Sequence, residues 1–101
     1  LTHMGINDII VDPGFGFSKT IDDNYRLMSH IDEFAQLGLP LLVGISRKSM
    51  IYKLLGTTPK ESLNGTTALN VLALIGGANI LRVHDVKEAV EAVKIVTKTI
   101  P

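Results

Sequence analysis

An α/β fold built from parallel βαβ units is predicted by two observations along this chain of 101 residues. Short apolar runs rich in β-branched residues, typical of strands buried on both faces, occur three times. Each run is followed by a longer segment whose apolar residues recur at helical spacing. Strands that alternate with helices form parallel units with right-handed crossovers. With 46% hydrophobic residues the chain can bury a core, and its length allows one domain at most.

The first unit starts with a predicted strand over residues 9–11 and a glycine-rich loop over residues 14–18. Asp22 or Asp23 is expected to cap the helix that follows, because a short carboxylate can accept from free backbone N–H groups. Gly38 closes that helix. Its apolar positions are Leu27, Met28, Ile31, Phe34 and Ala35.

The second unit has a predicted buried strand over residues 41–45 and a polar loop over residues 46–49. A short helix follows, and residues 58–61 read as a capping box with proline at the first helical position. A nearly all-apolar helix is predicted from about residue 67 to residue 75. Residues 58–63 are its lead-in, residues 64–67 are candidates for its cap, and Gly76-Gly77 ends it.

The third unit has a predicted strand over residues 80–83. Asp85 and Glu88 form a cap-like pair at the start of the last helix. One face of that helix is apolar and consists of Val86, Ala89, Val90, Val93, Val96 and Ile100.

The charge balance excludes some classes of partner. Ten basic residues offset ten acidic ones, so no long-range field attracts nucleic acid or an anionic membrane. The absence of cysteine excludes disulfides and thiolate chemistry and is compatible with a cytoplasmic protein. No apolar run approaches the roughly 18 residues that cross a bilayer. Residues 1–5 read like the last turn of a helix, so we expect further residues upstream.

Polar side chains gather where the predicted strands end. Asp12 follows the first strand, residues 46–49 follow the second, and Arg82, His84 and Asp85 lie on or after the third. In parallel α/β folds these ends share one rim, where ligands bind. The convergence of a carboxylate, an ammonium, a guanidinium and an imidazole therefore predicts a site.

Each of these groups also has a plain interpretation. Asp12 before Pro-Gly can simply start a turn, and Lys48 can be a solvated surface lysine. Arg82 lies between apolar residues, where an unpaired charge is costly, and His84 points to the same side. We favour a ligand role for this pair, and an internal ion pair with Asp85 or Asp12 is the alternative.

The remaining candidates are weaker. The glycine-rich loop lacks the endings of a P-loop and of a dinucleotide fingerprint. Phe15 and Phe17 are expected to be core residues or to floor a pocket for a flat ligand. His3 and His30 are expected at the surface, and two methionines are expected in the core, Met28 and Met50.

Three segments resemble successive signatures of the dihydropteroate synthase family. They are Asp12-Pro13-Gly14-Phe15-Gly16-Phe17-Ser18-Lys19, Gly44-Ile45-Ser46-Arg47-Lys48-Ser49-Met50 and Arg82-Val83-His84-Asp85-Val86. Ser18 differs from the glycine usual in the family. The resemblance implies a partial TIM barrel of about three βα units, strands six to eight, with residues 1–101 as one C-terminal portion.

The resemblance also implies a function. The family condenses 6-hydroxymethyl-7,8-dihydropterin diphosphate with p-aminobenzoate, with help from Mg²⁺, and sulfonamides compete with p-aminobenzoate. The chain itself is expected to form a homo-oligomer, because its first and third predicted strands leave unpaired edges and an apolar face open. Three of the rim residues would be catalytic, namely Lys48, Arg82 and His84. Because TIM barrels typically need about 250 residues, the isolated chain is expected to be inactive.

By the same resemblance, each motif contributes to substrate binding. Asp12 would bind the pterin, and Lys48 would contact both the pterin and p-aminobenzoate. Ser49 would bind the carboxylate of p-aminobenzoate, in a pocket that Phe17 lines together with Gly16. The diphosphate would be bound by Arg82 and His84. The alternatives are another pterin-binding barrel, such as a methyltetrahydrofolate-dependent methyltransferase, and a non-catalytic α/β phosphate-binding module.

Overall fold

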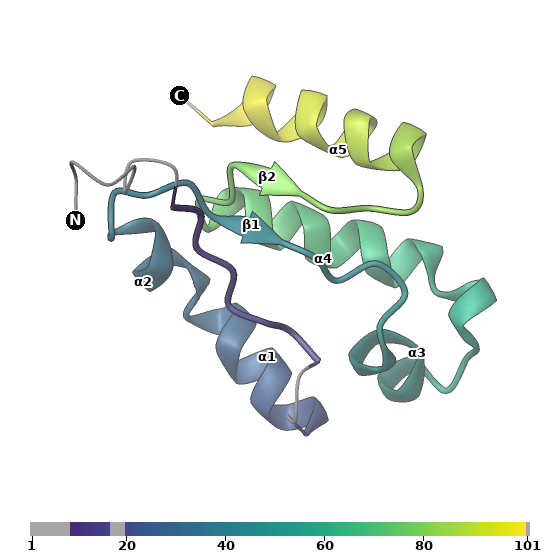
Figure 1. Ribbon diagram of the computed structural model, residues 1–101. Coiled ribbons are helices and arrows are strands. Elements are labelled where there is room, and N and C mark those ends of the chain that lie inside the picture. Colours follow the sequence, from purple (N-terminus) through teal and green to yellow (C-terminus); the bar gives the residue numbers. More distant parts are fainter. Residues whose placement is uncertain (1–8, 17–19, 101) are drawn as a thin grey trace.

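The computed structural model describes residues 9–16 and 20–100. Helices and two short strands alternate along this part of the chain (Figure 1). None of the described helices is long and apolar enough to cross a lipid bilayer. In chain order the elements are α1 (Ile21–Ser29), α2 (Ile31–Ala35), β1 (Leu42–Val43), α3 (Ser49–Leu55), the 3₁₀ helix η3 (Pro59–Glu61), α4 (Leu63–Ile75), β2 (Ile80–Leu81) and α5 (Val86–Thr99).

The three predicted strand segments lie side by side, parallel and in chain order. A single parallel bridge joins Val11 to Leu41, and β1 pairs with β2 in the register Leu42 to Ile80 and Val43 to Leu81. Each ladder is shorter than predicted. Ile9 and Ile10 are 39% and 49% exposed, so the prediction of a strand buried on both faces is wrong there, because pairing reaches only Val11 and only on one side.

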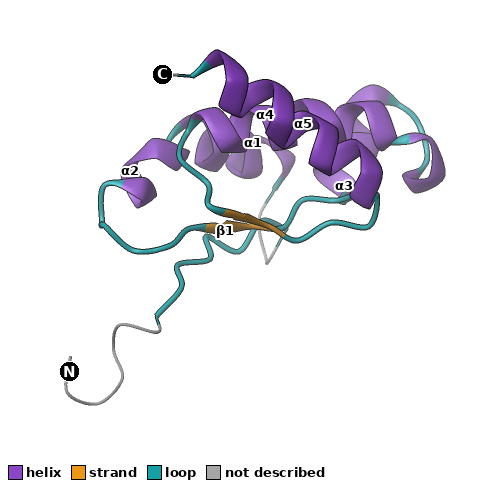
Figure 2. Ribbon diagram, turned by 90° about the horizontal axis from the view of Figure 1, so that it is seen from above, coloured by secondary structure: helices purple, strands orange, loops and turns teal. Residues whose placement is uncertain are grey.

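The helices lie on one side of the strands, and no described element covers the other side (Figure 2). Leu41, Val43 and Ile45 alternate along the second strand segment and are each 0% exposed. Their side chains belong to the same core as residues from α1, α2, α3 and α4. Alternation places Leu42 and Gly44 on the opposite face, which we call the open face.

The first predicted helix is divided in two. Thr20, not Asp22 or Asp23, caps α1: its hydroxyl accepts from the Asp23 N–H at 3.1 Å, and Asp23 closes the capping box. At the other end, the His30 N–H donates to the Leu27 carbonyl at 3.1 Å. The Ser29 hydroxyl occupies the Arg26 carbonyl at 2.7 Å, which an unbroken helix would use for the His30 N–H.

Three other predicted caps are wrong, and one of them is the Asp85–Glu88 pair of α5, where no side-chain cap bond is formed. Thr58 Oγ1 donates to Glu61 Oε1 at 3.1 Å instead of forming a reciprocal capping box, and residues 59–61 form the separate η3. Residues 64–67 lie inside α4, which begins at Leu63. The predicted end of α4 at Gly76 is confirmed. As expected, Met28 and Met50 are buried, and His30 is exposed; His3 lies outside the described residues.

Candidate functional site

The predicted site residues that the structure describes lie at or beyond the ends of the strand segments. Asp12 follows the bridge at Val11, Lys48 and Ser49 follow the second segment, and Arg82 and His84 follow β2. Because the segments are parallel, these ends lie at one edge of the layer. Phe17, another predicted site residue, lies outside the described residues.

Lys48 is not a solvated surface lysine. Its Nζ donates to the Phe15 carbonyl at 2.5 Å, and its Cδ lies 3.4 Å from the point that a Cβ on Gly16 would occupy. Lys48 is the N-cap residue of α3, and Ser49 is the first residue of that helix. Together Phe15, Gly16, Lys48 and Ser49 line a cavity of about 270 Å³. Three of the predicted binding residues therefore share one pocket.

Phe15 has the two roles that the sequence left open. Its side chain is only 1% exposed and belongs to the core, while the residue also lines the pocket and offers its carbonyl to Lys48.

Arg82 and His84 emerge on the open face. Exposure alternates along this segment, with Leu81 and Val83 partly buried and Arg82 and His84 exposed. The expectation of a costly buried charge at Arg82 is therefore wrong for this chain. Within residues 9–16 and 20–100, neither side chain has a hydrogen bond or ion pair, so the alternative of a pair with Asp85 or Asp12 is not formed.

The Arg82 guanidinium lies against Gly44. A Cβ on Gly44 would be 2.8 Å from Arg82 Nη2 and 3.0 Å from Nε. Glycine at this position leaves room for the guanidinium beside the end of β1. The His84 backbone is fixed separately, because its N–H donates to Ser46 Oγ at 3.2 Å.

Asp12 starts a turn, as expected for an aspartate before Pro-Gly. Its Oδ1 accepts from the Gly14 N–H at 2.9 Å, and the residue is exposed. The turn leaves the second carboxylate oxygen at the rim.

Arg47 and Asp85 form an ion pair that the sequence reasoning missed. Arg47 Nη2 and Nε donate to the two oxygens of Asp85 at 2.9 and 3.1 Å. This hydrogen bonding lowers the pKa of Asp85 and raises that of Arg47. The pair also explains why Asp85 makes no side-chain cap for α5. No local signal announces it, because the partners are 38 residues apart.

Two residues of α1 were also missed, although both hold parts of the site. The amide of Asn24, only 3% exposed, accepts from the Gly16 N–H at 2.8 Å and donates to the Thr20 carbonyl at 2.9 Å. The Tyr25 hydroxyl donates to the Met50 carbonyl at 2.8 Å, and burial raises the pKa of Tyr25.

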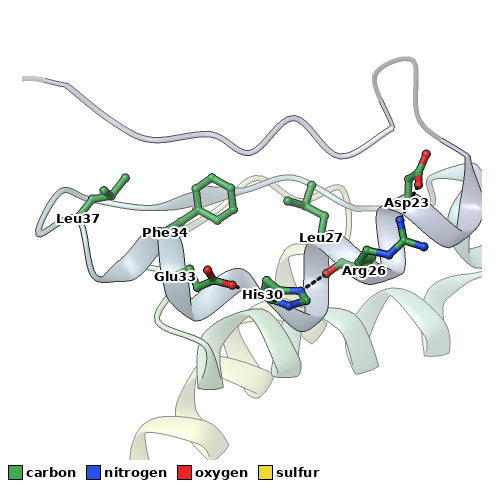
Figure 3. Close-up of a pocket in the computed structure, with 7 residues that line it drawn as sticks. All are labelled: Asp23, Arg26, Leu27, His30, Glu33, Phe34 and Leu37. Carbon is green, nitrogen blue, oxygen red and sulfur yellow. Dashed lines mark hydrogen bonds and ion pairs between the residues drawn. The ribbon is translucent and has the colours of Figure 1, made fainter.

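A larger hollow of about 650 Å³ is lined by residues of α1 and α2 and of the turn that follows, and contains none of the predicted site residues. Leu27, Phe34 and Leu37 point to one side of it (Figure 3). Its charged groups are exposed and paired locally: Arg26 contacts Asp23 at 3.2 Å and His30 lies 3.9 Å from Glu33. The smaller pocket at the rim is therefore the better candidate site.

A resident metal does not fit the described side chains. Among residues 9–16 and 20–100, no group of three histidine, cysteine, aspartate or glutamate residues could hold a metal ion.

Comparison with known proteins agrees with the motifs. The model of the family described as pterin binding enzyme matches residues 1–84. Dihydropteroate synthase of Escherichia coli is 52% identical over 92 residues, which are 91% of this chain and 33% of that protein. Dihydropteroate synthase of Synechocystis is 47% identical over 96 residues, 92% of this chain and 33% of the relative. The chain thus spans about a third of the length of these relatives.

Solved structures show the same relationship. The Yersinia pestis dihydropteroate synthase in a sulfonamide drug complex superimposes with a TM-score of 0.89 at 50% identity, over 92% of this chain and 34% of that one. The Coxiella burnetii dihydropteroate synthase in complex with pteroic acid gives 0.87 at 48% identity, over 90% and 34%. The match over residues 1–84 covers most of the chain, and the chain therefore belongs to the pterin-binding enzyme family.

Proposed function

We propose that this chain is part of a dihydropteroate synthase, a transferase that joins 6-hydroxymethyl-7,8-dihydropterin diphosphate to p-aminobenzoate and releases pyrophosphate. One observation carries the proposal: the described residues of the three family motifs, which are far apart in sequence, lie at one edge of the strand layer. The 52% identity with the Escherichia coli enzyme supports it.

The proposed parent is a TIM barrel in which this chain supplies strands six to eight. Two features of the described residues support an arc of a barrel. The strand segments are paired in chain order, and the helices lie on one side only (Figure 2). In a closed barrel, the helices form an outer ring and the opposite face of the strands forms the interior.

The pocket at Lys48 is proposed to hold p-aminobenzoate. Ser49 begins α3, and the free N–H groups at the start of a helix favour a carboxylate. Lys48 would contact the pterin from the same place. Asp12 would accept from the paired N–H groups of the pterin, a match in shape and charge. The sulfonamide complex of the Yersinia pestis relative is consistent with such a pocket in the family.

Arg82 and His84 are proposed to bind the diphosphate. During the transfer, the p-aminobenzoate amine attacks the pterin methylene carbon while the bond from that carbon to the diphosphate oxygen breaks. Negative charge grows on the leaving group, and donors placed beside it lower the barrier. The two side chains are exposed on the open face and are not paired with other described residues, which suits them to receive an anion.

Further properties of the parent are part of the proposal. Mg²⁺ would add electrostatic stabilisation of the departing pyrophosphate. Because the described side chains form no metal site, we assign it no ligand in this chain and no step. The parent is proposed to be a cytoplasmic homo-oligomer.

A hybrid protein tests the function directly. The segment of the Escherichia coli enzyme that matches this chain would be replaced by it, and the hybrid assayed for dihydropteroate formation. We expect turnover within tenfold of the Escherichia coli enzyme and none above background from the chain alone. An inactive but folded hybrid that binds phosphate and not pterin would favour a non-catalytic phosphate-binding module. Turnover by the pure chain would overturn the expectation that it is inactive alone.

A further inference from the structure

Two side-chain ties join the loop after β1 to the segment that leads into α5. Ser46 Oγ accepts from the His84 N–H at 3.2 Å, and Arg47 binds both carboxylate oxygens of Asp85. The tied residues are direct neighbours of the candidate site residues, since Lys48 follows Arg47 and His84 precedes Asp85. The two loops are therefore joined directly by side-chain bonds.

The Arg47 guanidinium is directed at protein groups. Besides the two bonds to Asp85, its Nη1 donates to the carbonyls of Pro59 and Lys60, each at 2.8 Å. The side chain is only 22% exposed. A planar guanidinium can satisfy a carboxylate and two carbonyls at fixed angles, which an ammonium cannot do. Arg47 therefore holds three segments together instead of offering its donors to a ligand.

The backbone of Arg47 is itself constrained. Its φ of 53° lies in the left-handed region, and within the described residues it is the only residue other than glycine with a positive φ. Residues with a Cβ avoid this region unless their surroundings impose it. Here the Arg47 N–H donates to Thr66 Oγ1 at 3.1 Å, and the side chain is anchored as above. This turn determines where α3 starts and thus where Lys48 and Ser49 lie.

We propose that Arg47 and Asp85 are a positioning pair that couples the two halves of the site. The pair fixes the Lys48–Ser49 half relative to the Arg82–His84 half, and touches no substrate itself. What the halves bind rests on the proposed function. Misplacement of reacting groups by about 1 Å costs on the order of a hundredfold in rate, so loss of the pair acts mainly on kcat.

The test uses the hybrid enzyme with Asp85→Asn, which keeps the size of the side chain and removes its charge. We expect kcat to fall at least tenfold, with the KM of each substrate changed less than threefold. Arg47→Lys is expected to give a similar loss, and the double variant is expected to be no worse than the poorer single variant, because the residues act as a unit. The matched control is Arg26→Ala, which removes an exposed ion pair with Asp23 on α1 and is expected to leave kcat unchanged.

The inference would be overturned if the kcat losses of the two single variants added in the double variant. It would also be overturned if the kcat of Asp85→Asn stayed within twofold of that of the unsubstituted hybrid. A melting temperature lowered without a change in kcat would show a purely structural pair. Amide NMR shifts give a readout independent of activity: Asp85→Asn is expected to move the resonances of Lys48 and Ser49. Resonance shifts confined to the sequence neighbours of residue 85 would refute the coupling between the two halves of the site, even in an inactive hybrid. Inactivity of the unsubstituted hybrid, by contrast, counts against the proposed function.

Discussion

Gly44→Ala is a small substitution that is expected to weaken anion binding by Arg82 without lowering the stability of the fold. The new Cβ would lie 2.8 Å from Arg82 Nη2, whereas nonbonded heavy atoms prefer a separation of about 3.5 Å or more. The guanidinium must therefore move by roughly 0.7 Å or more. Arg82 is exposed, so this movement is expected to cost no more than about 0.5 kcal/mol of folding free energy.

The effect on anion binding is expected to be larger. A hydrogen bond to a charged group contributes about 1.5–3 kcal/mol, and loss of about half of this weakens binding roughly three- to tenfold. Calorimetry with pyrophosphate on the hybrid enzyme measures the change directly. We expect pyrophosphate binding to be roughly three- to tenfold weaker, with a melting temperature close to that of the unsubstituted hybrid.

Gly65→Ala is the matched comparison. A Cβ there would lie 2.4 Å from Cγ2 of Ile51, and Ile51 is only 1% exposed, so the clash falls on the core. Overpacking of this kind costs about 1–3 kcal/mol, partly offset by the better helix propensity of alanine. We expect a lower melting temperature and unchanged pyrophosphate affinity. Equal pyrophosphate affinity in Gly44→Ala and the unsubstituted hybrid would refute the assignment of Arg82 to the anion.

Four further outcomes are expected. In the hybrid, Arg82→Ala and His84→Ala should each weaken pyrophosphate binding by about 1.5–3 kcal/mol and p-aminobenzoate binding far less; unchanged kinetics in both would make the pair structural. Lys48→Ala should weaken both substrates in calorimetry, and normal affinity for both would contradict its place between the pockets. The Arg47 hydrogen bond lowers the pKa of Asp85 from its usual value near 3.8, so this carboxylate stabilises the fold above that value. The stabilisation is lost as the pH falls through the lowered pKa. Measurement of the melting temperature at decreasing pH should show this loss in the unsubstituted protein and not in Asp85→Asn. The chain alone should form dimers or larger assemblies in light scattering, because it exposes strand edges and apolar side chains; a cooperatively melting monomer at every concentration would exclude this.

The order of strands and helices follows from sequence because it depends on local periodicity. The apolar run at residues 41–45 and the spacing of Leu27, Met28 and Ile31 identify their elements without any knowledge of partners. The ends of the elements depend on competition between neighbouring groups. Thr20 and Asp23 both suit a cap, and only the extended backbone of Thr20 decides between them.

The positions of the candidate site residues also follow from the local pattern of strands and helices, and their contacts with distant segments do not. Lys48 and Ser49 could be placed at the rim because they follow a strand, and in the structure they line one pocket together with Gly16. The role of Arg47 could not be read in the same way. Its carboxylate partner and the carbonyls that it binds come from segments folded against it, and a loop arginine has the same local pattern whether it is solvated or bonded.

The carbonyl of Pro59 accepts from three donors: Arg47 Nη1 at 2.8 Å, Ser62 Oγ at 2.6 Å and the Ser62 N–H at 3.3 Å. Ser62 is 0% exposed, and its own carbonyl receives the Thr66 N–H at 2.9 Å. These bonds fix the number of residues between Pro59 and Thr66. By contrast, residues 56–58 are exposed, and such turns accept insertions. Changes in chain length should therefore be tolerated just before Pro59 and rejected just after it, within a few residues along the same connection.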